Sequence, residues 1–230
     1  MADSPVMLIT GASTGIGAAT ARRAVEFGQR VVLGARSVDK LTELAEELGG
    51  ADHALAVRCD VIDWDDQQAL VAAALDRFGR LDSVFANAGF GAKRGFLEES
   101  DGHWKAMIDT NVLGVALSIR AALPHFLDRD AGHFVITSSV AGRVSLTGSL
   151  YSCTKHAVTA MGESLRQEVA DTAIKVTLIE PGMVDTPFFD DRPTAALEAD
   201  DIARAVLFAL TQPPHVDVNE ILVRPINQPF

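Results

Sequence analysis

Seven short apolar runs, separated by longer amphipathic segments, constrain the fold of this chain more than any other feature. The runs are VMLIT (6–10), RVVLGA (30–35), HALAVR (53–58), LDSVFA (81–86), GHFVITS (132–138), IKVTLIE (174–180) and VNEILVR (218–224). Most are apolar throughout instead of alternating, which is typical of strands buried on both faces of a parallel sheet. Helical patterns such as 37–48 and 63–78 lie between them, the second beginning at a suitable N-cap, Asp63. The alternation predicts one α/β domain over residues 1–230, with about seven strands in a doubly wound parallel sheet.

The charge of the chain limits its partners. It carries 31 Asp and Glu residues against 20 Lys and Arg residues, a formal net charge of −11. Nucleic acids and anionic membranes are bound by basic surfaces, so we expect neither as a partner. No apolar run reaches membrane-spanning length, and the N-terminal MADSPVMLIT lacks the basic region of a signal peptide. We therefore expect a soluble, cytoplasmic protein.

The two cysteines, Cys59 and Cys153, lie far apart and outside any CxxC motif. We expect both to be packing residues in a reducing compartment, and we expect no metal site.

One helical segment, LGVALSIRAAL (113–123), is apolar on nearly every side, with only Ser118 and Arg120 polar. Such a helix is either a fully buried core helix or has an outer face that contacts another subunit. We favour the subunit contact, because helices of a doubly wound fold normally keep one face in water. The segment thus predicts a homo-oligomer.

A glycine-rich segment, TGASTGIG (10–17), lies where the first predicted strand ends and a helix begins. Glycines at 11, 15 and 17 permit a tight turn and a close approach of the backbone to a ligand. The N–H groups at the start of the following helix suit a pyrophosphate. Turns alone can explain a glycine pattern, but its position after the first strand favours a dinucleotide site.

The second predicted strand ends at Ala35, and Arg36 follows. Dinucleotide folds that prefer NAD place an acid near this point, where it binds the ribose 2′-hydroxyl group. An arginine can instead hold a 2′-phosphate. The alternative is a solvated arginine at the start of a helix, a position unfavourable for a cation. We therefore expect NADP as the cofactor in preference to NAD.

Tyr151, the only tyrosine, lies four residues before Lys155 in SLYSCTKHAV (149–158). On a helix, this spacing puts both side chains on one face. An ammonium group near a phenol lowers the phenol pKa, and such a phenol can exchange a proton near neutral pH. Taken alone, the pair is equally a half-buried tyrosine beside a surface lysine, since YxxxK arises often by chance.

The full set of motifs resembles the short-chain dehydrogenase/reductase family, and the resemblance extends over nearly the whole chain. TGASTGIG is similar to the cofactor loop of that family. Asn87-Ala88-Gly89 is similar to its NAG motif, although Ala86 replaces an asparagine that often precedes that motif. The remaining matches are Asp60-Val61, Asn111, the serine of SSVAG, Tyr151-x-x-x-Lys155 and Pro181-Gly182-x-Val184-x-Thr186.

The resemblance implies a Rossmann-like fold, commonly a dimer or tetramer, and a role for each matched residue. Tyr151 is the general acid or base, Lys155 lowers its pKa and holds the nicotinamide ribose, and Asn111 supports a proton-relay water. A serine polarises the substrate carbonyl. The implied cofactor-binding residues, Arg36 included, are Gly11, Ser13, Thr14, Gly15, Ile16, Gly17, Arg36, Asp60, Val61, Asn87, Ala88, Gly89, Tyr151, Lys155, Pro181, Gly182, Val184 and Thr186.

Two adjacent serines compete for the substrate-polarising role. Ser139 directly precedes Val-Ala-Gly, as the family serine usually does, whereas the usual spacing to Tyr151 favours Ser138. Neighbouring residues on a strand face opposite ways, so only one can serve. We choose Ser139.

The predicted function is NADP(H)-dependent interconversion of a small alcohol and its carbonyl compound, of the ketone, aldehyde or 3-hydroxy acid type. The ending VNEILVRPINQ (218–228) is similar to a subgroup that acts on 3-hydroxy acids and serine-like alcohols. The alternatives are a dinucleotide-sensing protein without turnover, and an epimerase or dehydratase of related fold.

A short lid segment, about 185–200, is expected over the substrate. Its residues 188–191 form either part of this lid or an ordinary connecting loop. Lys93 and Arg94 are interpreted as solvated surface charges, the alternative being contact with a substrate carboxylate.

Overall fold

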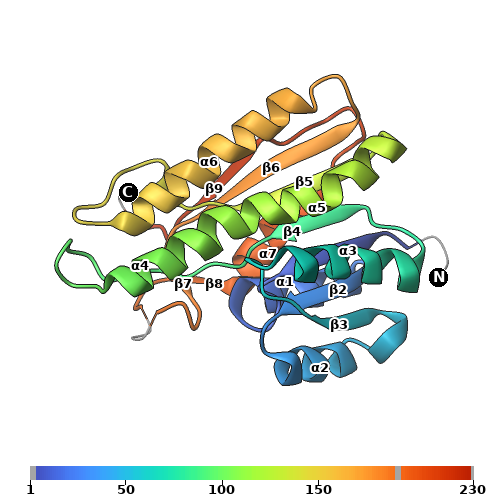
Figure 1. The fold of residues 1–230 in the computed structure, drawn as a ribbon, viewed down its shortest axis with the longest axis horizontal. Helices are drawn as coiled ribbons and strands as arrows, with labels where there is room; N and C mark the ends of the chain where they lie inside the picture. Colours follow the sequence, from blue (N-terminus) through green and yellow to red (C-terminus); the bar gives the residue numbers. More distant parts are fainter. Residues whose placement is uncertain (1–3, 190–192, 229–230) are drawn as a thin grey trace.

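The computed structural model describes residues 4–189 and 193–228 and contains the predicted parallel sheet (Figure 1). Its seven strands lie in the order β3-β2-β1-β4-β5-β6-β9. They are β1 (Val6–Thr10), β2 (Arg30–Ala35), β3 (Ala54–Arg58), β4 (Ser83–Ala86), β5 (Gly132–Thr137), β6 (Ile174–Pro181) and β9 (Glu220–Val223). Two short strands, β7 (Val184–Asp185) and β8 (Leu197–Glu198), pair with each other outside this sheet.

Helices cover both faces of the sheet. One layer consists of α1 (Gly15–Glu26), α2 (Val38–Glu47) and α7 (Ala199–Leu210). The other, in front in Figure 1, consists of α3 (Trp64–Phe78), α5 (Gly114–Arg129) and α6 (Leu150–Glu168). A helix α4 (Asp101–Ile108) runs into α5 through η2 (Asp109–Leu113), a single π turn. The 3-10 turns η1 (Gly50–Asp52) and η3 (Val140–Gly142) complete the elements.

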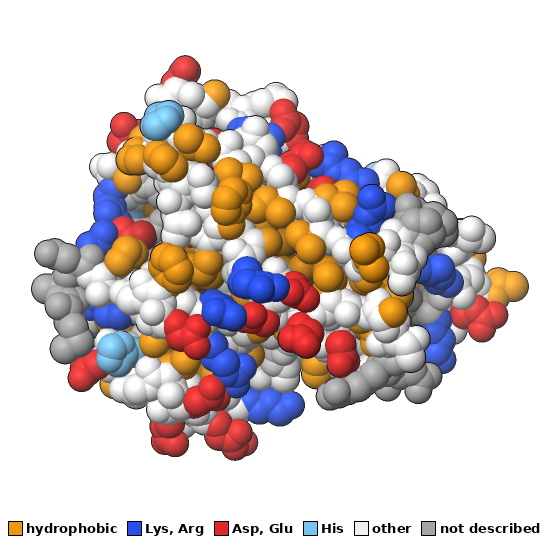
Figure 2. Space-filling view, turned by 180° about the vertical axis from the view of Figure 1, so that it is seen from behind, with side chains coloured by type: hydrophobic (Ala, Val, Ile, Leu, Met, Phe, Trp, Pro, Cys, Tyr) orange, Lys and Arg blue, Asp and Glu red, His pale blue; other side chains and the backbone are white. Residues whose placement is uncertain are grey.

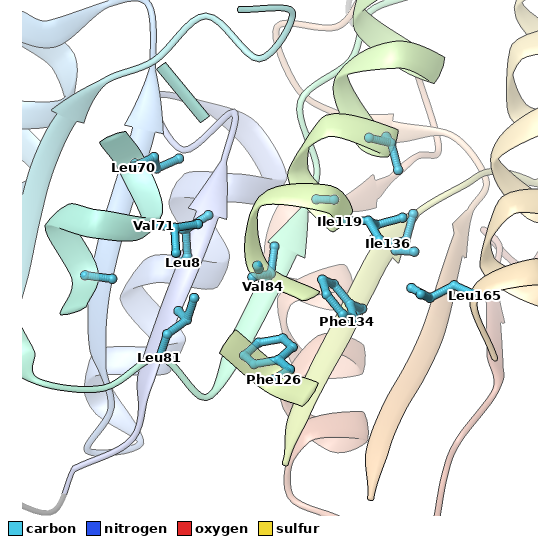
Figure 3. Close-up of a cluster of buried hydrophobic side chains, with 14 of the residues drawn as sticks. Leu8, Leu70, Val71, Leu81, Val84, Ile119, Phe126, Phe134, Ile136 and Leu165 are labelled. Carbon is cyan, nitrogen blue, oxygen red and sulfur yellow. The ribbon is translucent and has the colours of Figure 1, made fainter. Parts of the chain in front are cut away.

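The continuous apolar runs are explained by burial on both faces. Along β1, Val6 and Leu8 face the layer of α3, α5 and α6, whereas Met7 and Ile9 face the opposite layer. All four side chains are at most 2 % exposed. Figure 3 shows the buried apolar cluster between the sheet and the layer of α3, α5 and α6. In it, Phe126 and Phe134 pack edge to face, with 4.9 Å between ring centroids. A polar substitution at one of these four positions in β1 would therefore bury a polar group among apolar side chains.

The chain reverses its direction of strand addition between β1 and β4, which are neighbours in the sheet. In open α/β sheets the crevice outside the carboxyl ends of such strands is where ligands bind. The glycine-rich segment follows β1 and Asn87 follows β4. The topology thus brings both segments to this crevice.

The segment Asp101–Arg129, formed by α4, η2 and α5, is long and apolar enough to cross a membrane by length and composition. This segment is not an uninterrupted apolar run, because charged residues such as Lys105, Asp109 and Arg120 interrupt it. The same properties are found in core helices, and α5 packs Val115, Ala122 and Phe126 against the sheet in this structure. Its apolar character is thus accounted for by packing on that side.

Figure 2 shows the face of the molecule opposite to that in Figure 1. Acidic and basic side chains alternate over its lower half instead of forming separate fields. Exposed ion pairs such as Arg22–Glu47 and Arg23–Asp200 illustrate this arrangement. A surface of mixed sign does not attract polyanions strongly.

Candidate active site

A cavity of about 730 Å³ opens at the carboxyl ends of the strands. It is lined by segments that follow β1, β2, β3, β4, β5 and β6, and by the start of α6. All the sequence-predicted site residues line it except Gly17 and Asn111. The crevice predicted by the topology is thus a single continuous cavity.

The glycine-rich segment forms a narrow backbone cradle at one end of the cavity. Gly11 and Gly15 have φ values of +67° and +55°, which disfavour other residues. A Cβ atom on Gly17 would lie 2.4 Å from the carbonyl oxygen of Gly11, so Gly17 serves packing behind the cavity wall. Helix α1 begins at Gly15 without a side-chain cap, which leaves its first N–H groups available. This cradle fits a pyrophosphate.

Thr10, at the end of β1, links the glycine-rich segment to the segment after β4. Its Oγ1 atom accepts hydrogen bonds from the backbone N–H groups of Asn87 and Ala88 at 3.0 and 3.2 Å. The side-chain amide of Asn87 donates to the carbonyl oxygen of Thr10 over 3.2 Å. The two walls of the cavity are therefore fixed to each other.

Arg36 lies at the cavity wall after β2, near the end formed by Asp60 and Val61 after β3. Its guanidinium group has no ion pair or hydrogen bond with the residues that the structure describes. An unpaired guanidinium at this point is suited to a phosphate group.

Tyr151 and Ser139 meet at the opposite part of the cavity. Ser139 forms a side-chain hydrogen bond with Tyr151, accepts a bond from the N–H group of Ala141 at 3.1 Å and donates to the carbonyl oxygen of Pro181. Burial raises the pKa of Tyr151 to about 12, while the Ser139 bond lowers it in part. The phenol therefore keeps its proton at neutral pH and is suited to donate it.

Lys155 lies on the same face of α6 as Tyr151, as predicted, with its Nζ atom 5.8 Å from the centroid of the Tyr151 ring. The ammonium group donates to the carbonyl oxygen of Thr137 over 2.7 Å, and burial lowers the pKa of Lys155 to about 8. The prediction that the tyrosine pKa lies below its ordinary value is wrong for this arrangement. Burial of the phenol dominates, and the Ser139 hydrogen bond opposes it only in part.

Ser138 faces the other way from Ser139. Its hydroxyl group bonds to the carbonyl oxygen of Lys155 at 3.2 Å and to Thr159 Oγ1 at 2.7 Å. Ser138 thus ties the end of β5 to α6, and Ser139 is the serine beside Tyr151.

Asn111 is fully buried in the π turn and does not line the cavity. Its side chain accepts from the N–H group of Phe90 at 3.0 Å and donates to the carbonyl oxygen of Phe90 at 2.9 Å. A third bond, at 3.2 Å, reaches Thr154 on α6. Asn111 therefore holds the segment after β4 against the helix that carries Tyr151 and Lys155.

An ion pair supports the serine from behind. The Nε atom of Arg143, in the loop after Ser139, donates to Glu180 Oε1 at 2.7 Å. Glu180 is 1 % exposed and directly precedes Pro181, whose carbonyl oxygen accepts from Ser139. Burial raises the pKa of the Glu180 carboxyl group, and the Arg143 bond opposes this shift. Arg143 also pairs with Glu220 on β9.

Phe188 closes part of the cavity beside Tyr151. The two rings meet edge to face at 5.5 Å between centroids, and Phe189 contacts Phe188 at 5.0 Å. A Cβ atom on Gly91 would lie 2.8 Å from the Phe188 ring. The predicted lid segment therefore contributes to the cavity at its start, then forms β8 and enters α7 at Ala199. Its residues Asp190 and Asp191 lie outside the described residues.

Some cavity residues were not assigned to the site from the sequence, among them Phe90, Arg94, Thr137 and Gln228. Gln228 reaches the site from beyond β9, where its Oε1 atom accepts from the N–H group of Met183 at 2.8 Å. No motif marks it, because its position depends on where the last strand ends. The position of Thr137 could have been inferred from its place at the end of β5.

The two cysteines differ in their surroundings. Cys59 is buried, and burial raises the pKa of its thiol to about 12. Cys153 is exposed, so the prediction that it is a packing residue is wrong. Among the described residues, no group of three or more His, Cys, Asp or Glu side chains is arranged to hold a metal ion.

Residues 5–196 match the family model described as short chain dehydrogenase. An uncharacterized oxidoreductase from Staphylococcus haemolyticus is 43% identical over 226 residues, which cover 96% of this chain and 97% of that protein. An alcohol dehydrogenase from the archaeon Thermococcus sibiricus, complexed with 5-hydroxy-NADP, superimposes with a TM-score of 0.89 and 32% identity, covering 98% of each chain. The closed form of a serine dehydrogenase complexed with NADP+ has a TM-score of 0.93 and 31% identity, covering 98% of this chain and 96% of that one.

Proposed function

Because the chain belongs to the short-chain dehydrogenase family and is an oxidoreductase, we propose that it interconverts a small alcohol and its carbonyl compound with NADP(H). The observation that supports this most is the meeting of Tyr151, Ser139 and Lys155 at the wall of one cavity, whose other end is the glycine cradle. One ligand that spans this cavity reaches both groups of residues.

The proton chemistry follows from the states of the side chains. NADPH, when bound, supplies the hydride that is added to the carbonyl carbon. Tyr151 donates its proton to the carbonyl oxygen. The Ser139 hydroxyl group turns from the Pro181 carbonyl, donates a hydrogen bond to the same substrate oxygen and polarises it. In the reverse direction the tyrosine takes the proton from the alcohol. The nearby Lys155 ammonium stabilises the phenolate that remains after proton donation.

The cofactor would be held along the cavity by the matched family residues. The glycine cradle takes the pyrophosphate, Asp60 and Val61 lie beside the adenine, and Lys155 binds the nicotinamide ribose. Val184 and Thr186 orient the carboxamide. Asn111 acts through the Phe90 backbone and α6, where its hydrogen bonds fix the site around the proton donor.

NADP is proposed in preference to NAD because of Arg36. Its unpaired guanidinium lies where an acid would bind the ribose 2′-hydroxyl group in an NAD-preferring site. A 2′-phosphate group would pair with it through charge-assisted hydrogen bonds. The NADP and 5-hydroxy-NADP complexes of the two similar structures are consistent with this choice.

The substrate is proposed to be small. The lid segment (185–200) is short and already contains β7 and β8, which leaves little chain to enclose a large molecule. Phe188 narrows the cleft above Tyr151. The similarity to a serine dehydrogenase supports a short hydroxylated substrate.

We propose that the chain forms a homo-oligomer, a dimer or tetramer, through the outer face of helices α4 and α5. Ile108, Leu113 and Leu127 are 42, 45 and 47 % exposed there. Burial of such side chains against a second copy would stabilise the assembly. The cytoplasmic location remains a prediction from composition.

The proposal is tested by measuring NADPH oxidation with a panel of short aldehydes, ketones and oxo acids. The reaction is followed by the loss of NADPH absorbance. Turnover with at least one panel compound, lost in Tyr151→Phe, is the expected result. NADPH binding without turnover of any compound would favour the dinucleotide-sensing alternative.

A further inference from the structure

Two arginines of the described chain have no partner within it. Every other described arginine takes part in an ion pair, a hydrogen bond, an aromatic contact or another recorded interaction. Arg36 and Arg94 make none, and both line the cavity. Arg36 lies at the cofactor end, where a 2′-phosphate accounts for it. Arg94 is exposed and lines the cavity, so its guanidinium group is free to bind an anion that enters there.

Arg94 is held close to the helix that carries Tyr151. The N–H group of Gly95 donates to the carbonyl oxygen of Gly148 at 2.8 Å. Both glycines have positive φ values, and a Cβ atom on Gly148 would lie 2.8 Å from the Gly95 nitrogen. Gly148 directly precedes Ser149, the N-cap of α6. The backbone at Arg94 is thus packed directly against the start of α6.

The charges lining the cavity differ between its ends. Asp60 is its only acidic lining residue in the described chain, and it lies at the adenine end. The cavity also has apolar lining residues, and two of them lie near Tyr151: the Phe188 ring contacts Tyr151, and Phe189 contacts Phe188. Lys155 is the other cation there, but its ammonium group donates to Thr137 and is assigned to the nicotinamide ribose. Arg94 is the cation left to bind an anionic group of the substrate.

We propose that Arg94 binds a carboxylate group of the substrate, and that the enzyme acts on short oxo acids and the corresponding hydroxy acids. This deepens the proposed function and rests on it. A guanidinium group binds a carboxylate through two parallel hydrogen bonds, which fixes the orientation of the acid. The apolar wall accommodates the carbon chain between that carboxylate and the carbonyl group at Tyr151. Arg94 thereby selects the substrate without taking part in proton transfer.

The test compares acids with their uncharged esters. NADPH oxidation is measured with 3-oxobutanoate, 4-oxopentanoate and the methyl ester of each, in the wild type, Arg94→Gln and Arg94→Lys. The matched control is Lys93→Gln, because Lys93 is exposed and adjacent but does not line the cavity. We expect Arg94→Gln to raise KM for the better acid at least about tenfold, the loss of one good charged contact. The kcat value and both esters should change little, Arg94→Lys should be intermediate, and Lys93→Gln should match the wild type.

A binding experiment separates this inference from the proposed function. Calorimetric titration of 4-oxopentanoate and its methyl ester uses the protein saturated with NADP+, which cannot reduce a ketone. Tighter binding of the acid in the wild type, lost in Arg94→Gln, supports the inference whatever the turnover. Equal binding of acid and ester, or an acid preference that survives in Arg94→Gln, overturns it. Turnover of neutral ketones alone overturns the inference but leaves the proposed function intact.

Discussion

The Nζ atom of Lys155 donates a hydrogen bond to the carbonyl oxygen of Thr137, the last residue of β5, over 2.7 Å. Burial lowers the pKa of this lysine to about 8. The side chain is therefore a cation below that pH and loses its charge above it. A cation beside Tyr151 favours loss of the phenolic proton to the substrate.

We accordingly expect kcat/KM for carbonyl reduction to be level near pH 7 and to fall as the pH rises through about 8. Profiles between about pH 6 and 10 measure this dependence. Lys155→Arg keeps its charge over that range, so the activity that it retains should show no such fall. The same inflection in the arginine variant would assign the titration to another group.

Tyr151→Phe removes the hydroxyl group proposed as the proton donor but keeps the ring that packs against Phe188. We expect kcat to fall by a factor of about 10²–10⁴, the usual contribution of general acid catalysis. The dissociation constant of NADPH, measured by fluorescence titration, should change little. Cys153→Ala, at an exposed position of the same helix, is the control. Unchanged turnover in Tyr151→Phe would rule out the assigned role.

Arg36→Asp replaces the cation proposed for the 2′-phosphate with an acid. The ratio of kcat/KM for NADPH to that for NADH should fall at least about tenfold, which corresponds to about 1.4 kcal/mol. Lys40→Asp makes the same change of charge on α2, outside the cavity, and should leave the ratio unaltered. An unchanged ratio in Arg36→Asp would mean that the arginine does not distinguish NADPH from NADH.

Phe188→Ala removes the ring that narrows the cleft beside Tyr151. Relative to a small ketone, kcat/KM for an aryl ketone should rise about tenfold, since a void replaces the ring. Phe96→Ala, at an exposed position outside the cavity, should show no such change. If both variants keep the wild-type preference, Phe188 does not limit substrate size.

His133 makes the protein sensitive to acid. Burial, with a smaller effect of Lys175, lowers the pKa of His133 to about 3. The unfolded chain therefore binds a proton that the folded protein does not, and stability falls as the pH drops from about 6.5 toward 3. At most about 5 kcal/mol of the free energy of unfolding depends on this group. Urea unfolding of His133→Gln should show a flatter pH dependence, whereas exposed His215→Gln should follow the wild type.

Much of the fold was predictable because burial on both faces leaves a strong signal. The run RVVLGA coincides with β2, and Asp63 caps α3 by accepting from the N–H group of Asp66 at 2.9 Å. Alternation along an extended strand also predicted that only one of Ser138 and Ser139 faces Tyr151. In these cases the local sequence pattern was enough to predict the position of the strand, the helix cap and the orientation of the serine.

Other features depend on contacts that the local sequence does not encode. The raised pKa of Tyr151 comes from burial by segments such as the one containing Phe188. The role of Asn111 depends on the π turn, which directs its amide toward the Phe90 backbone. Arg94 could not be distinguished from its neighbour Lys93, because which of them lines the cavity depends on how their loop packs against the segment before α6.

The pairing of Arg143 with both Glu180 and Glu220 links the edge strand β9 to the segment that follows Ser139. A change at Glu220 frees one arm of the guanidinium group, and the loop that begins at Ser139 then loses part of its anchorage. Sequence variation on an outer strand can thus change how firmly the Ser139 hydroxyl group beside Tyr151 is held. Loss of turnover after a mutation at Arg143 or Glu220 would therefore not by itself identify a residue that contacts the substrate.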